Sequence, residues 1–440
     1  MAKTLTRQDD RKQAGDSLKA ALARQPVIAA VDLGASKVAC FVMKPDGVRR
    51  SDRTLTTAGV GYVQSRGVKG ATISSMDEAA EAIALAVERA ESVAGVSVQG
   101  VTIATAGGQM RSDRVSARVS IGARPISDND CSRALAAALD QIRLPGRRPL
   151  HILPIAWSVD SQKGVRDPRA MFGKTLGVEL LVVSVAETVF NTLGACVERA
   201  HLQLEGVVAA PFVSALAALQ EDEMDLGSVC IDMGGGSTSA SVFRGGSLVH
   251  VETVPVGGQH ITNDIARGLS TTISHAERMK TLWGSALAST VDEREMISVP
   301  LLGERGVDTV QQVPKSMLTG IIRPRLEETF ELLRYRLESS GQAHLGGRRL
   351  VITGGASQLN GVREVAGQWL DRHVRMGSPA HVQGMPESAH SPGFSVCAGL
   401  LNYALKPDVH YELPKHKVQQ VERARQGYVS RVGRWIAESF

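Results

Sequence analysis

The fold is decided by the stretch Val27-Ile-Ala-Ala-Val-Asp32-Leu-Gly34-Ala-Ser36-Lys37-Val-Ala-Cys-Phe-Val42. Apolar residues flank a short polar turn on both sides, which predicts two buried strands joined as a hairpin. The turn places Asp32 at a strand end, then Gly34 where the backbone must bend sharply, then Ser36 and Lys37. Such a turn presents backbone N–H groups, a hydroxyl and a cation together, so it can hold phosphate oxygens.

A second stretch repeats this pattern far along the chain, in Val229-Cys-Ile-Asp232-Met-Gly234-Gly235-Gly236-Ser237-Thr238-Ser-Ala-Ser-Val-Phe243. It again runs from an apolar strand through an aspartate and glycines to hydroxyl side chains. Two such hairpins facing each other can clasp a phosphate chain. Asp32 and Asp232 would then hold the water shell of Mg²⁺, which prefers carboxylate and water oxygens.

A third glycine-rich turn follows in Leu350-Val-Ile-Thr353-Gly354-Gly355-Ala356-Ser357-Gln358. It predicts a strand that runs into a helix beginning near Leu359. Its glycines allow a flat base or a ribose to lie against the backbone. Each turn alone is a common motif, and the three in this order indicate a nucleotide site.

The three turns resemble those of the actin, Hsp70 and sugar-kinase superfamily, in which two α/β lobes close on ATP. From Val27 to Phe440 the chain is also similar to one family within it, the bacterial cell-division FtsA family. The shared stretches are Gly67-Val-Lys-Gly70, Pro255-Val-Gly257-Gly258-Gln-His-Ile-Thr-Asn263-Asp264-Ile-Ala266, Ala276-Glu277-Arg-Met-Lys280 with Gly284, Ile352-Thr-Gly-Gly-Ala356, and the amphipathic end. The resemblance implies ATP and Mg²⁺ as ligands.

The resemblance also implies which residues contact the nucleotide. In the family a Glu-x-x-Lys helix reaches the ribose and base, which here means Glu277 and Lys280. Residues three apart share a helix face, although a solvated surface pair would fit the same spacing. The implied contacts are Asp32, Gly34, Ala35, Ser36, Lys37, Asp232, Gly234, Gly235, Gly236, Ser237, Thr238, Gly257, Gly258, Glu277, Lys280, Gly354, Gly355, Ala356 and Ser357.

Hydrolysis of ATP in this superfamily needs a side chain that orients the attacking water. Hsp70-like relatives carry a glutamate before a proline where the chain crosses between lobes, and actin uses a nearby glutamine. The matching pair here is Ala210-Pro211. Because alanine cannot orient water or accept its proton, we expect ATP binding with slow or negligible turnover, and no catalytic residue is assigned.

The predicted fold class is α/β, with two actin-like lobes, an inserted α+β subdomain and a C-terminal amphipathic helix. The boundaries take their subdomain names from the resemblance. We predict a disordered tail over 1–25, subdomain 1A over 26–107 and 177–225 with 394–405 packing back, the inserted subdomain 1C over 108–176, subdomain 2A over 226–257 and 320–393, subdomain 2B over 258–319, a linker over 406–425 and a membrane-targeting helix over 426–440.

The last fifteen residues predict a short membrane anchor. In a helix their apolar side chains share one face, and basic residues flank that face. A helix of about 14 residues is about 21 Å long, too short for a hydrocarbon core of about 30 Å, so it would lie in the membrane interface. The residues are Tyr428, Val429, Arg431, Val432, Arg434, Trp435, Ile436 and Phe440. A terminal helix docked on the protein's own core is the alternative.

The 440-residue chain carries a formal charge of +5, and this excess lies in its ends. Residues 1–25 hold six basic and three acidic side chains, and residues 401–440 hold seven and four. This distribution fits an anionic membrane surface better than nucleic acid. The five scattered cysteines predict neither disulfides nor zinc. The first 25 residues lack a secretory pattern, so we expect a cytoplasmic location.

The family resemblance implies several partners. These are the tail of tubulin-like FtsZ, later division proteins, further copies of this chain in a filament, and the cytoplasmic face of the inner membrane at the division septum. Arg323, Arg325 and Glu328 are the candidate contacts for the acidic FtsZ tail, although a plain solvated helix face fits them as well.

Three alternatives share the fold. A phosphotransferase or polyphosphate hydrolase would need a carboxylate base where Ala210 stands. An Hsp70-like chaperone would need a β-rich domain after the third turn, but only about 80 residues follow Ser357. A relative of the pilus-assembly protein PilM would not be expected to carry the C-terminal anchor.

Overall fold

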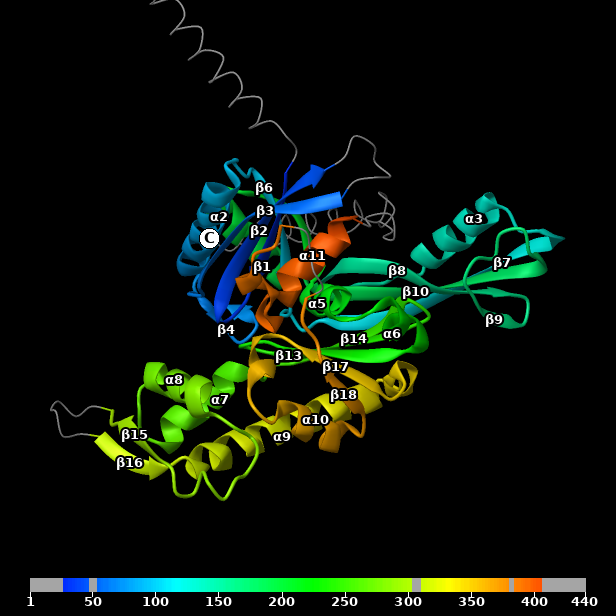
Figure 1. The fold of residues 1–440 in the computed structure, drawn as a ribbon. Coiled ribbons are helices and arrows are strands. Elements are labelled where there is room, and N and C mark those ends of the chain that lie inside the picture. The colour runs from blue at the N-terminus through cyan, green and yellow to red at the C-terminus, as the bar shows by residue number, and fades with distance from the viewer. Residues whose placement is uncertain (1–26, 47–53, 303–309, 380–383, 406–440) are drawn as a thin grey trace, which may run out of the picture. The chain divides into compact units, whose positions relative to one another are not determined.

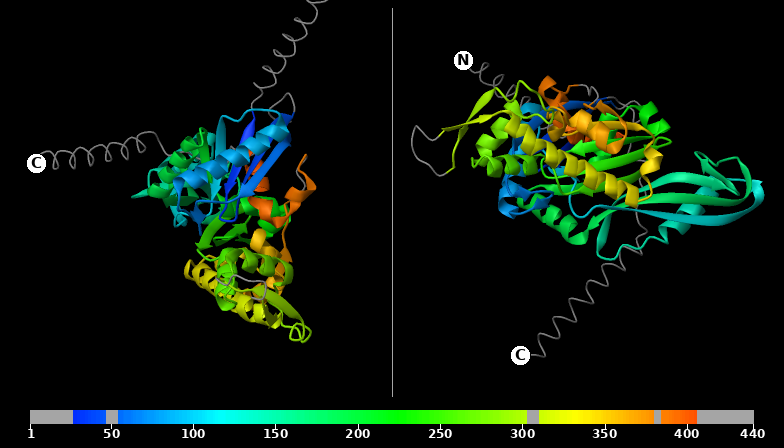
Figure 2. Two further views of the ribbon diagram at one scale, coloured as in Figure 1. Left: turned by 90° about the vertical axis from the view of Figure 1, so that its left-hand side faces the viewer. Right: turned by 90° about the horizontal axis from the view of Figure 1, so that it is seen from below.

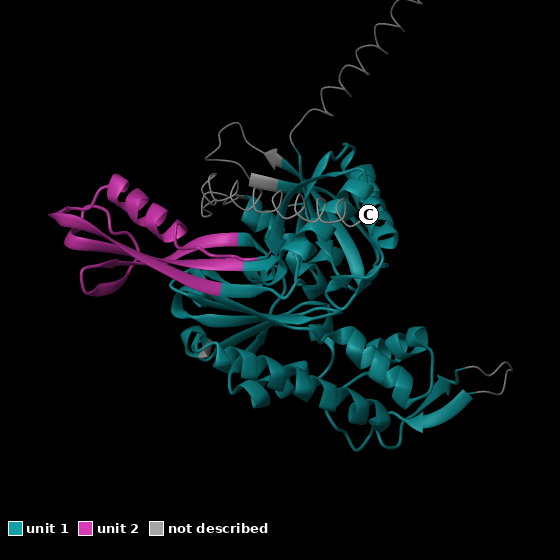
Figure 3. Ribbon diagram, turned by 180° about the vertical axis from the view of Figure 1, so that it is seen from behind, with its two compact units in different colours: residues 1–112, 146–150, 184–407 teal, residues 113–145, 151–183, 408–440 magenta. Residues whose placement is uncertain are grey.

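The computed structural model describes residues 27–46, 54–302, 310–379 and 384–405 (Figure 1). These residues form two compact units, each described separately (Figure 3). The first takes in the described residues up to 112, 146–150 and those from 184 onward, and the second takes in 113–145 and 151–183. The predicted N-terminal tail, linker and amphipathic helix lie outside the described residues.

The first unit begins with a five-stranded sheet whose order is β11-β6-β1-β2-β3. β1 (Ile28–Leu33) and β2 (Lys37–Asp46) form the predicted hairpin, with Asp32 opposite Ala39. β3 (Thr54–Gln64) continues the sheet on one side, and β6 (Gly100–Thr105) and β11 (Gln203–Ala209) run parallel to β1 on the other.

Successive strand residues point to opposite sides of this sheet, and both sides are apolar. Helices therefore cover both faces. Val31 packs toward α2 (Met76–Ala94) and α4 (Glu187–Arg199) in one core cluster. Ala30 packs toward α5 (Ala210–Ala218) and α11 (Ser395–Leu405) in another. Figure 2 shows α2 lying against its face of the sheet. A small hairpin of β4 (Val68–Lys69) and β5 (Thr72–Ile73) precedes α2.

A second five-stranded sheet in the same unit repeats the arrangement in the order β14-β13-β12-β17-β18. β12 (Ser228–Met233) and β13 (Thr238–Arg244) form the second predicted hairpin. Asp232 lies opposite Ser239, and β17 (Arg349–Thr353) runs parallel to β12. β14 (Ser247–Val254) and β18 (His373–Met376) form the edges. The repeat confirms the predicted two-lobed α/β class.

The helices of this second lobe surround one large apolar core. They are α6 (Glu221–Leu226), α7 (Gly258–Gly268), α8 (Ile273–Trp283), α9 (Ser316–Ser339) and α10 (Val362–Leu370). A hairpin of β15 (Met296–Pro300) and β16 (Val310–Pro314) extends from it, and short 3₁₀ turns lie at η1 (Ala343–Gly346), η2 (Gly355–Gln358), η3 (Glu387–His390) and η4 (Pro392–Phe394). A helix interrupted at Pro324 is the expectation from its sequence, because proline removes a backbone donor. This expectation is wrong, because α9 continues through Pro324.

The second unit belongs to the predicted α+β insertion. Its sheet has the order β7-β10-β8-β9, formed by β7 (Arg111–Pro125), β10 (Phe172–Ala186), β8 (Arg147–Val159) and β9 (Gln162–Val165). α3 (Asp128–Leu139) packs against these strands around a separate core that includes Leu135, Leu176 and Leu180. An independent core is what an inserted subdomain requires.

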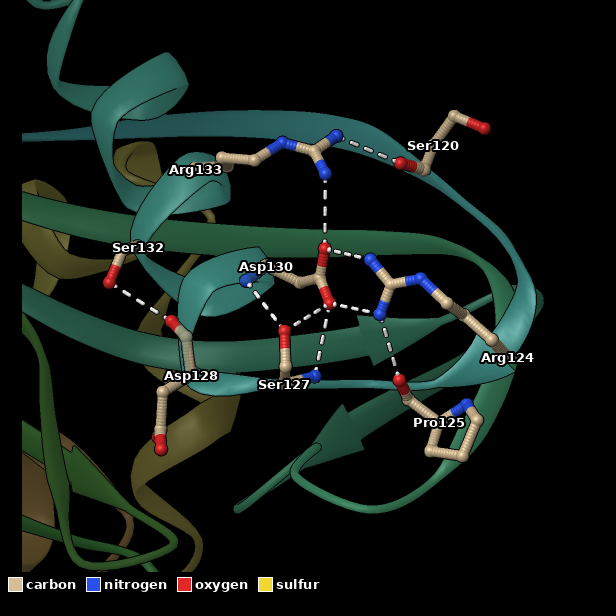
Figure 4. Close-up of polar contacts among 8 residues, drawn as sticks. All are labelled: Ser120, Arg124, Pro125, Ser127, Asp128, Asp130, Ser132 and Arg133. Carbon is tan, nitrogen blue, oxygen red and sulfur yellow. Dashed lines mark hydrogen bonds and ion pairs between the residues drawn. The ribbon is translucent and has the colours of Figure 1, made fainter.

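The N-terminus of α3 is fixed by a buried carboxylate (Figure 4). Both oxygens of Asp130 accept from Arg124 at 2.8 Å, and one accepts from Arg133 at 3.0 Å. Ser127 donates to Asp130 through its hydroxyl at 2.6 Å and its backbone N–H at 3.0 Å, which completes a capping box. The Arg124 hydrogen bonds, followed by those of Ser127, hold the pKa of Asp130 well below its usual range.

We expect Asp130→Asn to loosen α3. The lowered pKa means that the charged carboxylate stabilises the insertion above its unfolded-state pKa of about 3.9, and that this stabilisation disappears as the pH falls through the folded-state value. At neutral pH hydrogen exchange in α3 should therefore accelerate by about tenfold or more. Ser132→Ala removes only an exposed bond to the carbonyl of Asp128 and is the control. Equal exchange in both variants would contradict this role.

Among the described residues, no helix has the length and apolar character needed to cross a membrane. All five cysteines are buried, so they pack as small apolar residues.

Candidate functional site

The three predicted turns meet at a cavity of about 1120 Å³ in the first unit. Both hairpin turns and the third turn line it. Glu277 and Lys280 of α8, called the α8 pair below, line it as well. The predicted nucleotide contacts that line it are Asp32, Gly34, Ala35, Ser36, Lys37, Asp232, Gly234, Gly235, Gly236, Ser237, Gly258, Glu277, Lys280, Gly354, Gly355 and Ala356. A volume of this size accommodates a nucleoside triphosphate, since ligand pockets commonly span about 300–1,000 Å³.

The two hairpin turns have the same internal geometry. The N–H of Gly34 donates to the carbonyl of Lys37 at 3.1 Å, and that of Gly234 donates to the carbonyl of Ser237 at 2.9 Å. Each turn follows a strand whose second-to-last residue is the aspartate. The structure therefore brings together two equivalent turns from segments far apart in the sequence, each with an acidic residue at its base.

The third turn requires a glycine at Gly354. Its φ is +91°, and an added Cβ would lie 2.3 Å from Oδ1 of Asp232 and 2.5 Å from the carbonyl oxygen of Met233. A side chain there would be strained and would displace the second hairpin turn. Gly354 thus keeps the third turn directly against the carboxylate of Asp232 in the second hairpin.

Burial in this cavity disfavours the charged forms of the two aspartates. Burial raises the pKa of Asp32 to about 7, with Lys37 opposing the shift and Asp232 adding to it. Burial also raises the pKa of Asp232 to about 6, against a hydrogen bond from Ser214 and the charge of Lys37. A divalent cation would relieve this cost, and paired carboxylates are the oxygen ligands that Mg²⁺ prefers. The residues present therefore fit Mg²⁺, held directly or through water.

These shifts predict that Mg²⁺-dependent nucleotide binding weakens in acid. Both folded-state pKa values lie above the unfolded value of about 3.9, so protons bind the folded site below about pH 7 and compete with the cation. Between pH 8 and pH 6 we expect the Mg²⁺-dependent gain in ATP affinity to fall on the order of tenfold. Titration calorimetry with Mg²⁺ and with EDTA separates this gain from the pH dependence of ATP itself. An Asp32→Asn variant should show a flatter profile, and a wild-type gain that does not change with pH would contradict the prediction.

Lys37 reaches the cavity, but its ammonium group contacts an aromatic ring. Nζ lies 3.2 Å from the ring centroid of Phe394, a cation–π contact. Burial lowers the pKa of Lys37, and the charge of Asp32 opposes this shift. The contact with Phe394 could not be predicted from the sequence, because η4 lies far from the β1–β2 hairpin along the chain and carries no recognisable motif.

Glu277 and Lys280 share a face of α8, as their spacing predicts. Nζ of Lys280 donates to Oε2 of Glu277 at 2.7 Å, to Oγ1 of Thr262 at 2.8 Å and to the carbonyl of Gly258 at 3.1 Å. The Lys280 side chain is only 14% exposed, whereas the Glu277 side chain is 52% exposed, so the lysine is largely buried and its carboxylate partner reaches solvent. The pair therefore forms part of a network between α8 and the start of α7.

Three of the predicted contacts do not line the cavity. Thr238 is buried and donates to the carbonyl of Val256 at 2.8 Å. Ser357 is also buried and donates to the carbonyl of Gly354 at 2.7 Å. Gly257 packs so closely on the second hairpin turn that an added Cβ would lie 2.6 Å from the carbonyl oxygen of Gly234. All three therefore pack against backbone groups at or next to the turns and do not face the cavity.

Ala210 lies in the cavity wall at the start of α5, followed by Pro211. Its side chain offers no hydrogen-bonding group at the position where a water-orienting residue is expected.

The candidate FtsZ contacts lie elsewhere, on α9. Arg325 is held by Asp264 at 2.5 Å and by Glu328, and Arg323 by Glu327 at 2.8 Å. The predicted basic side chains therefore already have acidic partners.

Several wall residues were missed by the sequence analysis. Gly70 comes from the β4–β5 hairpin, and Thr105 is the last residue of β6. On the other side, Asn360 donates to Oγ of Ser285 at 3.2 Å and closes the wall beside Trp283. Gly70 lies in a stretch that carries the family resemblance, but nothing in that stretch or around the other residues indicates a place in the wall, so only the assembled fold identifies them.

The repeated sheets and the shared cavity define the actin-like two-lobed fold class. The solved structure of a PilM–PilN type IV pilus biogenesis complex supports the fold alone, with a TM-score of 0.59 and 16% identity over 88% of this chain and 100% of that chain. The family model "Cell division protein FtsA" matches residues 229–399, and "SHS2 domain inserted in FTSA" matches residues 107–184. FtsA proteins of Agrobacterium fabrum and Rhizobium meliloti are 41% and 40% identical, each alignment covering 95% of this chain and 96% of the relative. The chain belongs to the FtsA family of cell division proteins.

Proposed function

We propose that this protein binds ATP with Mg²⁺ and links division filaments to the cytoplasmic membrane. The observation that carries the nucleotide part is the meeting of three glycine-rich turns around two desolvated aspartates and Lys37. The hairpin turns would hold the phosphates, Asp32 and Asp232 the cation, and the third turn with the Glu277–Lys280 pair the nucleoside. When bound, Mg²⁺ supplies positive charge that neutralises the phosphates.

Turnover of the bound ATP is proposed to be slow. Positioning of the attacking water supplies much of the rate in phosphoryl transfer, and Ala210 offers no group for it. The nucleotide would then act mainly by drawing the lobes together and favouring self-association into filaments. The inserted subdomain 1C is proposed to contribute contacts along the filament and to later division proteins.

The membrane part of the proposal rests on the sequence of residues 426–440. A short amphipathic helix binds an interface reversibly, and several such helices carried by one filament bind far more tightly. Polymerisation and membrane residence would therefore be coupled. The proposed location is the cytoplasmic face of the inner membrane at the septum.

The FtsZ tail is proposed to bind the face of α9 that carries Arg325 and Glu328. Because Arg325 already pairs with Asp264, an acidic tail would have to share or replace that carboxylate. We also propose that the subdomains 1A, 1C, 2A and 2B have the boundaries predicted from the sequence.

Calorimetry with ATP and a steady-state phosphate-release assay test the nucleotide part. We expect saturable, Mg²⁺-enhanced binding of ATP and turnover below about one per minute, as for intrinsic nucleotide hydrolysis without a positioned catalytic group. Absence of ATP binding would overturn the proposed ligand. Turnover well above that rate would overturn the assignment of Ala210 and favour an enzyme of the same fold.

A further inference from the structure

Gln259 lies at the place where the two hairpin turns meet. It is the second residue of α7, and its backbone N–H donates to the carbonyl of Gly235 at 2.8 Å. The preceding N–H, that of Gly258, donates to the carbonyl of Gly234 at 3.0 Å. The first turn of α7 is therefore attached to the hairpin turn of the second lobe through two backbone bonds.

The Gln259 side chain crosses to the other lobe. Its Nε2 donates to the carbonyl oxygen of Ala35 at 2.8 Å, in the turn of the β1–β2 hairpin. One half-buried residue thus holds both turns, the second through its backbone and the first through its amide. Gln259 is not among the residues that line the cavity, so this bond leaves the nucleotide space free.

The two turns also touch directly, so a small separation would break the bond. An added Cβ at Gly235 would lie 2.0 Å from Oγ of Ser36 in the first turn. An added Cβ at Gly236 would lie 1.8 Å from the carbonyl oxygen of Gly70, which belongs to the β4–β5 hairpin of the first lobe. A hydrogen bond weakens sharply beyond about 3.2 Å. The Gln259–Ala35 bond therefore exists only when the lobes are as close as they are here.

We propose that Gln259 is a positioning residue that couples occupation of the phosphate end of the cavity to closure of the two lobes. This inference rests on the proposed nucleotide binding and specifies how the same site is regulated. A ligand that bridges both turns favours the closed arrangement, and the amide adds its bond only in that arrangement. A ligand that contacts only the second lobe gains nothing from it.

The test compares Gln259→Ala with Asn263→Ala, an exposed amide residue on the same helix. Loss of one neutral hydrogen bond should weaken ATP·Mg²⁺ binding about fivefold, since its net contribution enters only the closed state. Adenosine affinity should stay unchanged, whereas general damage to the fold would reduce both. Gln259→Glu should weaken ATP binding at least as much, because a carboxylate cannot donate to the Ala35 carbonyl. Asn263→Ala should bind like the wild type.

Hydrogen exchange of the nucleotide-free protein separates this inference from the proposed function. We expect Gln259→Ala to accelerate exchange at residues 34–37 and 234–237 together. If the wild type binds ATP while Gln259→Ala matches it within twofold and exchanges equally, the inference is overturned and the proposed function stands. If the wild type binds no ATP, the proposed function fails and the coupling to nucleotide fails with it, while faster exchange in both turns would still establish the cross-lobe bond.

Discussion

Replacing Gly236 with alanine should abolish nucleotide binding. The added Cβ would lie 1.8 Å from the carbonyl oxygen of Gly70 and 2.3 Å from its carbonyl carbon. Because these are backbone atoms, no side-chain rotation relieves the clash, and the second hairpin turn must move away from the β4–β5 hairpin. We expect ATP affinity to fall by about 100-fold or more, because the groups of the second turn lose their position opposite the first lobe. Calorimetry with ATP·Mg²⁺ measures this directly.

Gly320→Ala is the matched control for that substitution. Gly320 is an exposed residue of α9, and an added Cβ there meets no atom within 4 Å. Alanine should stabilise the helix by up to about 1 kcal/mol without changing ATP affinity. Binding by Gly236→Ala within threefold of the wild type would show that the close contact between the second hairpin turn and the β4–β5 hairpin is not needed for the ligand.

Ending the chain at Arg425 should remove binding to anionic vesicles. The deleted segment carries six apolar side chains that would share a helix face. Each contributes about 1.5–3 kcal/mol when fully buried, before the cost of ordering the helix, so the whole affinity depends on this face. We expect co-sedimentation with vesicles to fall by about tenfold or more relative to the full chain, with ATP·Mg²⁺ present in both cases.

Point substitutions separate the apolar face from simple shortening of the chain. Trp435→Glu places a charge within the predicted face and should reproduce the deletion, whereas Ser430→Ala lies outside it and should bind normally. Equal sedimentation of the full and shortened chains would remove the membrane anchor from the account.

The hairpin turns could be predicted from sequence because each is built within one short segment. The apolar runs on both sides, the aspartate and the glycine define the two strands and their turn locally. Asp32 and Asp232 therefore appear at the cavity where the motif places them. The α8 pair was predictable for the same reason, since a spacing of three residues defines a helix face.

The contacts between lobes could not be predicted in this way. Gly70, Gln259 and Phe394 reach the hairpin turns from distant segments, and none belongs to a periodic pattern that marks it. Their roles depend on which surfaces meet after folding. Thr238 is the opposite case. The motif predicts that its hydroxyl contacts the nucleotide, but in the folded sheet this hydroxyl donates to the carbonyl of Val256 instead.

Recruitment of FtsZ to vesicles tests the central claim most directly. Purified FtsZ, with or without its C-terminal tail, is sedimented with anionic vesicles in the presence of ATP·Mg²⁺ and either the full chain or the chain ending at Arg425. The account predicts that tailed FtsZ sediments only with the full chain, and that tailless FtsZ stays in the supernatant with both. FtsZ that stays in solution while the full chain occupies the vesicles would contradict the proposed tether.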